Sequence, residues 1–415
     1  MARRPLAAGA EGPTSPGRRD LSVGLYTYST LPRGSVVHTA HLAEALAEAG
    51  CDVTVYALDK DGRGFFRPLR GARLRLIPAA ATPASTADLV RLRAGEMAAY
   101  LDRHAPAHDV DHGEDCLSTS GLLAARAHGR RTTLVRTIHH VESFHDPFLA
   151  DCQARSIRQV DHLLTVSRTT ADDVARIFGS TAALVGNGVD VDRFVCLDAG
   201  RVAAWRTRLA GLASPRDVHP GPLILAVGGV EERKNTLALL GAFARLREAH
   251  PAAQLWIVGG ASVLDHGAYR RAFEAARATL RPAVGGAVIE LGVVAEDDMP
   301  ALYHLADVVA LPSLQEGFGL AALEALAAGV PLVASDRPPF TEFLDGDCAT
   351  LVDPRSEEAI ARALGAALAS HTAIRRVRGR QRARAHSWAA VAARHISEYE
   401  RMLVHARDAL LGSMA

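Results

Sequence analysis

Two glutamates flank a glycine turn in the second half of the chain. The stretch EGFGLAALE places Glu316 eight residues before Glu324. A glycine turn lets backbone N–H groups approach a ligand closely, and the helix expected at 320–328 adds positive potential suited to a phosphate. Carboxylates accept hydrogen bonds from sugar hydroxyls. The pattern indicates one elongated ligand with hydroxyl and phosphate groups, or else a surface glutamate and a capping glutamate of an ordinary helix.

A pair of cations precedes a second expected helix start. The stretch VGGVEERKNT, residues 227–236, holds Arg233 and Lys234 just before a helix that should begin near Thr236. Cations in this place can neutralise a pyrophosphate, the lysine as a point charge and the arginine as a fork. Two solvated loop cations would give the same pattern.

Two histidines follow an expected strand in the first half. His139 and His140 stand in VRTIHHVESFHDP, just past a strand that should begin near residue 133. A histidine at the carboxyl end of a strand can contact a reacting sugar or phosphate, although many histidines are ordinary core or surface residues. No metal site is expected, because the 18 histidines show no HExxH spacing and the five cysteines form no CxxC pair.

The elements that must position these residues follow one plan in each half of the chain. The first half predicts a strand at 22–26, a loop, a helix at 36–49 and a strand at 52–58. The second half predicts the same order at 222–227, 228–235, 236–249 and 253–258. Further strands are expected at 133–138, 163–166, 183–185, 287–291, 308–312 and 332–334. Alternating strands and helices predict an α/β fold with two Rossmann-like domains facing a central cleft.

The length of 415 residues also favours two domains. We expect a flexible tail at 1–20, an acceptor domain at 21–197, a linker at 198–221 and a nucleotide-sugar domain at 222–386. A final helix, about 387–410, should pack back on the first domain. The first loop lacks the G-x-G-x-x-G fingerprint, which argues against a nicotinamide dinucleotide.

Composition limits the partners and the location. The net charge is +1, so nothing favours a nucleic acid, and no apolar run is long enough to span a membrane. Scattered cysteines and a tail without an apolar core favour the cytoplasm over secretion. Six arginines in 374–386 predict a solvated, partly helical face; contact with an anionic membrane surface is the less favoured interpretation.

These motifs together resemble a known family. EGFGLAALE is similar to the E-x7-E motif of retaining glycosyltransferases of family 4, which have the GT-B fold. The segments GNGVDVDRF, TVSRTTADDV and LPRGSVVHTAHLAEALAEAGCDVTV resemble further family segments, in the family's order. The resemblance covers nearly the whole chain and implies transfer of a sugar from a nucleotide-diphosphate donor, without a metal or another cofactor.

The resemblance also implies a role for individual residues. Glu316 would contact hydroxyls of the donor sugar, Glu324 would hold the ribose, and Lys234 would bind the diphosphate. His139 would lie near the reacting carbon, and Val294 beside the base. The remaining implied contacts are backbone amides, those of Gly317, Phe318 and Gly319 to the sugar and that of Leu320 to the phosphates.

Two positions depart from the family pattern. Many members carry an arginine where this chain has Gly229, so Arg233 would supply the second positive charge. The first-domain loop often has two glycines, and here it reads Gly34-Ser35. Gly34 is still expected to approach the donor or the acceptor.

The predicted activity is therefore transfer of a sugar, with retained configuration, from a UDP-, GDP- or ADP-sugar. The acceptor would be a small molecule, a glycan or a lipid. The alternatives are a sugar-nucleotide 2-epimerase and a non-catalytic sugar-nucleotide binding module. The presence of Lys234, Glu316 and Glu324 argues against both.

Overall fold

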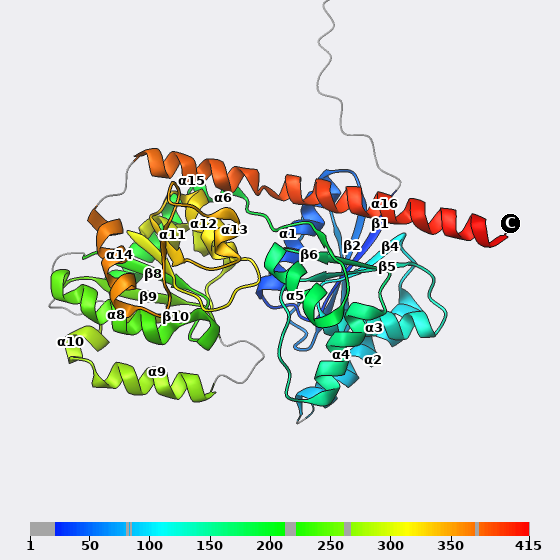
Figure 1. The fold of residues 1–415 in the computed structure, drawn as a ribbon, viewed down its shortest axis with the longest axis horizontal. Helices are drawn as coiled ribbons and strands as arrows, with labels where there is room; N and C mark the ends of the chain where they lie inside the picture. The colour runs from blue at the N-terminus through cyan, green and yellow to red at the C-terminus, as the bar shows by residue number, and fades with distance from the viewer. Residues whose placement is uncertain are drawn as a thin grey trace, which may run out of the picture.

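The computed structural model describes residues 21–79, 83, 85–211, 221–260, 267–369 and 373–414. The tail expected at 1–20 and the part of the expected linker at 212–220 lie outside the described residues. Two parallel sheets form the centres of two α/β units, which Figure 1 shows side by side. The predicted fold class is confirmed.

The first sheet has seven parallel strands in the order β3-β2-β1-β4-β5-β6-β7. Its centre is apolar because buried strands such as β1 carry Val23 and Leu25, both inaccessible to solvent. The strands are β1 (Ser22–Thr27), β2 (Asp52–Asp59), β3 (Arg73–Pro78), β4 (Val110–Gly113), β5 (Thr133–Ile138), β6 (His162–Thr165) and β7 (Ala183–Leu184).

Helices cover both faces of the first sheet. One buried apolar cluster packs it against α1, and a second packs it against α2 and α3. Several helices begin at a side-chain cap, as at Ser85, Asp115 and Ser167, each of which accepts a hydrogen bond from a backbone N–H of the first turn. These helices are α1 (Gly34–Glu48), α2 (Thr86–His104), α3 (Cys116–Ala127), α4 (Pro147–Arg158) and α5 (Arg168–Phe178). Two shorter helices follow, α6 (Val191–Val195) and α7 (Ala199–Ala210), and both pack against the second unit.

The second sheet has six parallel strands in the order β10-β9-β8-β11-β12-β13. The strands are β8 (Leu223–Val227), β9 (Gln254–Val258), β10 (Val288–Gly292), β11 (Val308–Leu311), β12 (Leu332–Ser335) and β13 (Thr350–Val352). Around them lie η1 (Glu232–Lys234), α8 (Thr236–Ala249), α9 (Gly267–Thr279), α10 (Pro282–Gly285), η2 (Glu296–Asp298), α11 (Met299–Leu305), α12 (Leu320–Ala328), α13 (Phe340–Phe343), α14 (Glu357–Ala369) and α15 (Ala373–Ala385).

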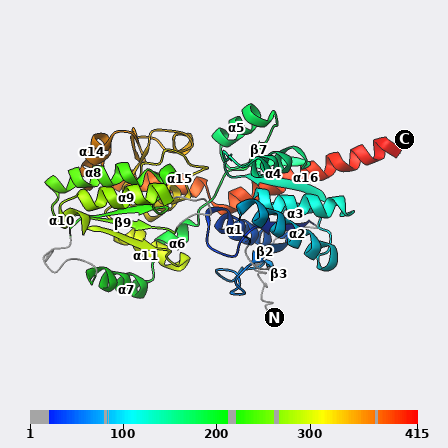
Figure 2. The same cartoon turned by 90° about the horizontal axis from the view of Figure 1, so that it is seen from below.

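Two segments connect the units. Trp205 of α7, in the segment expected to be the linker, is buried in the core of the second unit. Phe194 of α6, in the segment expected to end the acceptor domain, is buried there too. The last helix, α16 (Trp388–Met414), runs back along the first unit, where Val391 and Tyr399 pack with Leu42 of α1. Figures 1 and 2 show this return from two directions.

The arginines of α15 contact the protein more than the sequence suggested. Arg380 donates to the carbonyls of Ala327 and Ala328 at the end of α12, over 3.3 Å each. Arg375 donates to two further carbonyls, while Arg378 and Arg382 pair with Asp347 and Asp345. The expected solvated face is therefore only partly correct, because four of the six arginines bond to other parts of the second unit. Fewer arginines remain that could contact a membrane surface.

Every strand predicted from the sequence is present within one residue of its expected bounds, and α8 and α12 have the predicted bounds. The strands β3, β4 and β13 had not been predicted. In the part of the chain that the structure describes, no helix is both long and apolar enough to cross a membrane.

Candidate active site

The loop after β8 holds Lys234 in a fixed place. Gly228 has a φ of 129°, and a Cβ there would lie 2.4 Å from Cε of Lys234, so the lysine stem crosses the backbone where only glycine fits. Asn235, with a φ of 59°, donates to the carbonyls of Pro312 and Pro354 over 3.0 and 2.6 Å. The loop is thereby tied to the end of β11.

The glycine turn lies between β11 and α12. Gly319 has a φ of 99°, and a Cβ there would lie 2.4 Å from the ring of Phe340. The side chain of Phe318 is buried and stacks on Phe343, with ring centroids 4.8 Å apart. The side chain of Phe318 is thus part of the core, which leaves its backbone as the group that could contact a ligand. Leu320 begins α12.

Glu316 joins the two loops. Its carboxylate accepts hydrogen bonds from Nζ of Lys234 at 2.6 Å and from Oγ of Ser313 at 2.9 Å. A guanidinium nitrogen of Arg233 lies 3.4 Å away. Burial alone would raise the pKa of Glu316, but the charges of Lys234 and Arg233 outweigh it and lower that pKa. The predicted sugar contact and the predicted diphosphate contact therefore form one charged pair.

Glu324 lies inside α12 and accepts a hydrogen bond from the hydroxyl of Tyr303 at 2.6 Å. Burial raises the pKa of Glu324, while Tyr303 and the charge of Arg193 act in the opposite direction. Tyr303 was not predicted from the sequence, because the contact spans 21 positions and two helices.

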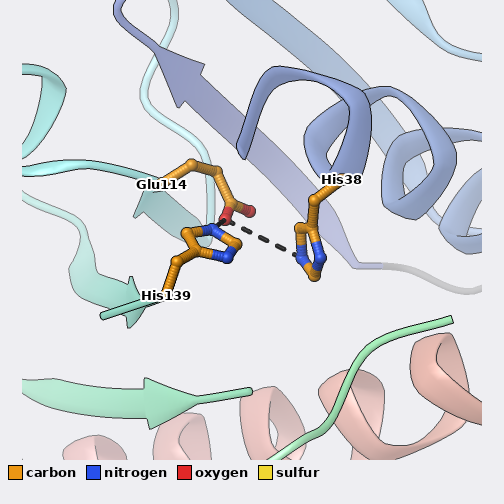
Figure 3. A group of neighbouring side chains, drawn as sticks. All are labelled: His38, Glu114 and His139. Carbon is orange, nitrogen blue, oxygen red and sulfur yellow. Dashed lines mark hydrogen bonds and ion pairs between the residues drawn. The ribbon is translucent and has the colours of Figure 1, made fainter. Parts of the chain in front are cut away.

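His139 follows β5 directly, as predicted. Its Nε2 lies 3.1 Å from Oε2 of Glu114, a contact that Figure 3 shows together with His38 of α1. Burial lowers the pKa of His139 to about 3, so the ring is neutral at ordinary pH. His140 is exposed and pairs with Glu142 at 2.7 Å.

The two units meet at His139 and the glycine turn. A Cβ on Gly317 would lie 2.1 Å from the carbonyl oxygen of His139, so only glycine allows this approach. The structure therefore brings together Lys234, Glu316, Gly317 and His139. By contrast, Gly34 is exposed, and a Cβ there would find no atom within 4 Å.

Val294, the residue expected beside the base, lies in the loop between β10 and η2. It is partly buried and packs against the core of the second unit, whereas its neighbour Val293 is 68% exposed. The contact of Val294 with a base therefore stays a prediction.

A second contact between the units had not been predicted. Glu296 of η2 accepts from His41 at 2.8 Å, from Arg67 at 3.0 Å and from Arg193 at 2.7 Å. Burial alone would raise the pKa of Glu296, but the bond to His41 and the charges of Arg193 and Arg67 lower it to about 2. Glu342 adds a further contact, accepting from the backbone N–H groups of Arg168 and Thr169 at the start of α5.

The group most suited to a metal ion, among the residues described, is His38, Glu114 and His139. Their possible ligand atoms lie within 4.8 Å of one another. Glu114 and His139 already face each other across a 3.1 Å hydrogen bond, so we interpret the group as a hydrogen-bonded cluster.

Comparison with known proteins gives the family. A model described as "Glycosyltransferase Family 4" matches residues 32–193, and one described as "Glycosyl transferases group 1" matches residues 221–370. A "D-inositol 3-phosphate glycosyltransferase" of Xylanimonas cellulosilytica is 32% identical over 85% of this chain and 90% of its own length. The chain belongs to glycosyltransferase family 4.

Two further similarities cover almost the whole chain. An "MMP alpha-(1->4)-mannosyltransferase" of Mycolicibacterium hassiacum is 29% identical over 91% of this chain and 97% of its own length. The solved sucrose-phosphate synthase of Thermosynechococcus elongatus has a TM-score of 0.75 at 22% identity, covering 93% of this chain and all of that one. The protein is thus a family 4 glycosyltransferase with the GT-B fold, and a nucleotide sugar is its donor.

The large hollow on the second unit of this glycosyltransferase is not at the site. A cavity of about 610 Å³ is lined by Pro222, Asp307 and Pro331, each of which precedes a strand. Ligands of open parallel sheets bind at the opposite, carboxyl ends of the strands. Glu316 and Lys234 lie at those ends.

Proposed function

We propose that this glycosyltransferase moves a hexosyl group, with retention, from a UDP-, GDP- or ADP-sugar to a hydroxyl of a small molecule, glycan or lipid. The observation that carries the proposal is the 2.6 Å bond between Lys234 and Glu316 beside the start of α12. A bound donor sugar would substitute for this bond at each partner. Its diphosphate would bind Lys234, and its sugar hydroxyls would donate hydrogen bonds to Glu316.

In the proposed reaction, the bond between the anomeric carbon and the diphosphate oxygen breaks as the acceptor oxygen attacks from the same face. The acceptor proton passes to the departing phosphate oxygen. Lys234, Arg233 and the first backbone N–H groups of α12 stabilise the charge that develops on the diphosphate. These groups belong to the protein, so we propose that no metal is needed.

Arg233 is proposed to replace the family arginine that is absent at Gly229. Gly229 has a φ of 73°, and a Cβ there would lie 3.0 Å from the carbonyl oxygen of Gly260, so a larger residue would be strained. Arg233 lies 3.4 Å from the same carboxylate that Lys234 contacts. This distance supports a shared role in neutralising the diphosphate.

Family membership supports transfer over the 2-epimerase and the idle binding module. The relatives act on different acceptors by their names, a D-inositol 3-phosphate glycosyltransferase and an α-(1→4)-mannosyltransferase among them. We therefore propose only that the acceptor offers a hydroxyl group and binds to the first unit. A cytoplasmic location stays a prediction from the cysteine pattern.

Incubation with UDP-, GDP- and ADP-hexoses tests the proposal. Inositol phosphates, free hexoses and phosphatidylinositol serve as acceptors that carry free hydroxyls, and NMR reads the anomeric configuration of the product. A retained glycoside, or slow donor hydrolysis without an acceptor, supports transfer. An epimerised donor supports the 2-epimerase, and binding with neither reaction supports the idle module.

A further inference from the structure

We propose that Glu114 is a positioning residue for His139: its carboxyl group fixes which ring nitrogen of His139 carries the proton. The ring then presents either an acceptor or a donor to the bound sugar. The proposal deepens the proposed function and rests on it, because it takes His139 to lie at the reacting carbon. Nothing in the sequence motifs had assigned a role to Glu114.

Glu114 is buried at the centre of the first unit, directly after β4. Its side chain is inaccessible to solvent, and its Oε2 shares a 3.1 Å hydrogen bond with Nε2 of His139. Its Oε1 has no hydrogen-bond partner among the described residues. The ion-pair neighbours of Glu114 in that part of the chain are three histidines, His38, His112 and His139, and no lysine or arginine.

The other two histidines are committed elsewhere. Nδ1 of His38 lies 3.0 Å from Oδ1 of Asn187, which also accepts from the N–H of Gly188. This oxygen is an acceptor, so His38 carries its proton on Nδ1, and its Nε2 lone pair faces Oε2 of Glu114 at 3.9 Å. His112 bonds through both nitrogens, to Tyr399 at 2.7 Å and to Thr137 at 2.8 Å. Of the three, only His139 shares a hydrogen bond with the carboxyl group.

The state of the Glu114 carboxyl group then decides the tautomer of His139. An ionised carboxylate accepts from Nε2–H, which leaves Nδ1 as a hydrogen-bond acceptor. A protonated carboxyl group donates to Nε2, which places the proton of the ring on Nδ1. None of the described residues hydrogen-bonds to Nδ1, and the side chain of His139 is 15% exposed beside the glycine turn. Nδ1 is the atom that remains for a ligand.

The carboxyl group changes state near neutral pH, whereas its neighbours do not. Burial raises the pKa of Glu114 to about 7. The titratable groups that face it are His38 of α1, His112 of β4, His139 after β5 and Tyr399 of α16 (Figure 3 shows the first and third). Burial lowers the pKa of His38 to about 4 and that of His139 to about 3, lowers that of His112 well below its usual value, and raises that of Tyr399 well above its usual value. Glu114 is the member of this group that titrates around pH 7.

The ionised state is the active one in this proposal. Nδ1 of His139 then accepts a hydrogen bond from a sugar hydroxyl, and the buried negative charge favours the positive charge that develops at the anomeric carbon. Turnover should fall as the pH is lowered through about 7. Donor affinity should change less, because Lys234 and Glu324 bind the nucleotide.

Histidine ¹⁵N NMR on the full chain without substrate tests the proposal directly. The His139 signals are assigned by their loss in His139→Gln. In the wild type, His139 should carry its proton on Nε2 at pH 8.5 and on Nδ1 at pH 5.5, with a midpoint near 7. Glu114→Gln should abolish the midpoint. The control is His395→Gln, which should leave the midpoint in place: His395 of α16 is a buried histidine whose ring centroid lies 6.2 Å from that of His38 and 5.9 Å from that of His112.

The kinetic test compares pH profiles for the same three proteins. Glu114→Gln should lower kcat about tenfold at pH 8 with little change in KM, and its profile should be flat through pH 7. A pH-dependent change of tautomer, or a pH limb, that is the same in Glu114→Gln and the wild type would overturn the proposal. So would a wild-type transition that vanishes after metal chelation, since a metal ion would then occupy the site. If Glu114→Gln does not fold, the wild-type titration decides alone, and a missing midpoint near 7 overturns it.

The NMR result does not depend on any transfer activity. A tautomer switch that depends on Glu114, together with no reaction on any donor, would leave the positioning role intact and refute the proposed function. Transfer activity without a tautomer switch would support the proposed function and refute the positioning role of Glu114.

Discussion

Lys234 and Glu316 bind each other across 2.6 Å, although they lie on separate loops after β8 and β11. Each is the residue expected to bind a different part of the donor. The pair therefore keeps both side chains in place, and neither charge is left unpaired in a buried setting before the donor arrives. A ligand with a diphosphate at one end and hydroxyls at the other can satisfy both groups at once.

Lys234→Ala should weaken the binding of a nucleoside diphosphate much more than the binding of the free nucleoside. A hydrogen bond to a charged group is worth about 1.5–3 kcal/mol, so the loss should be roughly tenfold to a hundredfold. Calorimetry with the diphosphate and the nucleoside measures both. The matched control is Lys60→Ala, since Lys60 is an exposed lysine on the other unit. Equal weakening of both ligands would show that Lys234 does not contact the phosphates.

His139→Ala should lower kcat by about tenfold or more and leave nucleotide affinity nearly unchanged. The reason is its place against Gly317, on the opposite unit from Lys234 and Glu324. His140→Ala is the control, because His140 is exposed and bonds only to Glu142 among the described residues. A fully active His139→Ala variant would reduce this histidine to a structural role.

Glu296→Gln should loosen the contact between the two units. His41, Arg67 and Arg193 all bond to this carboxylate, and each such bond to a charge is worth about 1.5–3 kcal/mol when it is lost. Small-angle X-ray scattering should give a larger radius of gyration for the variant. Asp297→Asn is the control, since the Asp297 side chain is 70% exposed. An unchanged radius would mean that other contacts hold the units together.

The same variant carries a pH prediction. The pKa of Glu296 is lowered from 4.5 to about 2 in the folded protein. Its contribution to stability is therefore complete above pH 4.5 and is lost as the pH falls through about 2. The difference in unfolding midpoint between wild type and Glu296→Gln should be largest at neutral pH and shrink below pH 4.5. A difference that grew on acidification would contradict this sign.

The features predicted from the sequence are those that depend on a local pattern of residues. Apolar runs predicted the buried strands, and Gly317 and Gly319 predicted a turn whose crowding the structure confirms. The sequence did not predict β4, because Asp111 and His112 interrupt the apolar pattern of this short strand. Glu114 at its end therefore passed unnoticed.

The other features that the sequence did not predict are contacts between elements far apart in the chain. Glu296 and His41 are 255 positions apart, and Tyr303 reaches Glu324 from another helix. Such pairs have no sequence signal of their own, because their proximity arises from how the two units pack. The roles of Lys234, Glu316, Glu324 and His139 stay predictions, now with a geometry that experiments can address.

The most direct test of the account compares Glu316→Ala and Glu324→Ala against the bare nucleoside diphosphate and the intact donor sugar. Glu324→Ala should weaken the binding of both ligands by roughly tenfold to a hundredfold, because both contain the ribose. Glu316→Ala should weaken binding of the intact donor only. Binding of the bare diphosphate should be unchanged or stronger, because the substitution frees Lys234 from its bond to Glu316. If both variants lost affinity for both ligands alike, the two glutamates would not divide the donor between them, and the central claim would be contradicted.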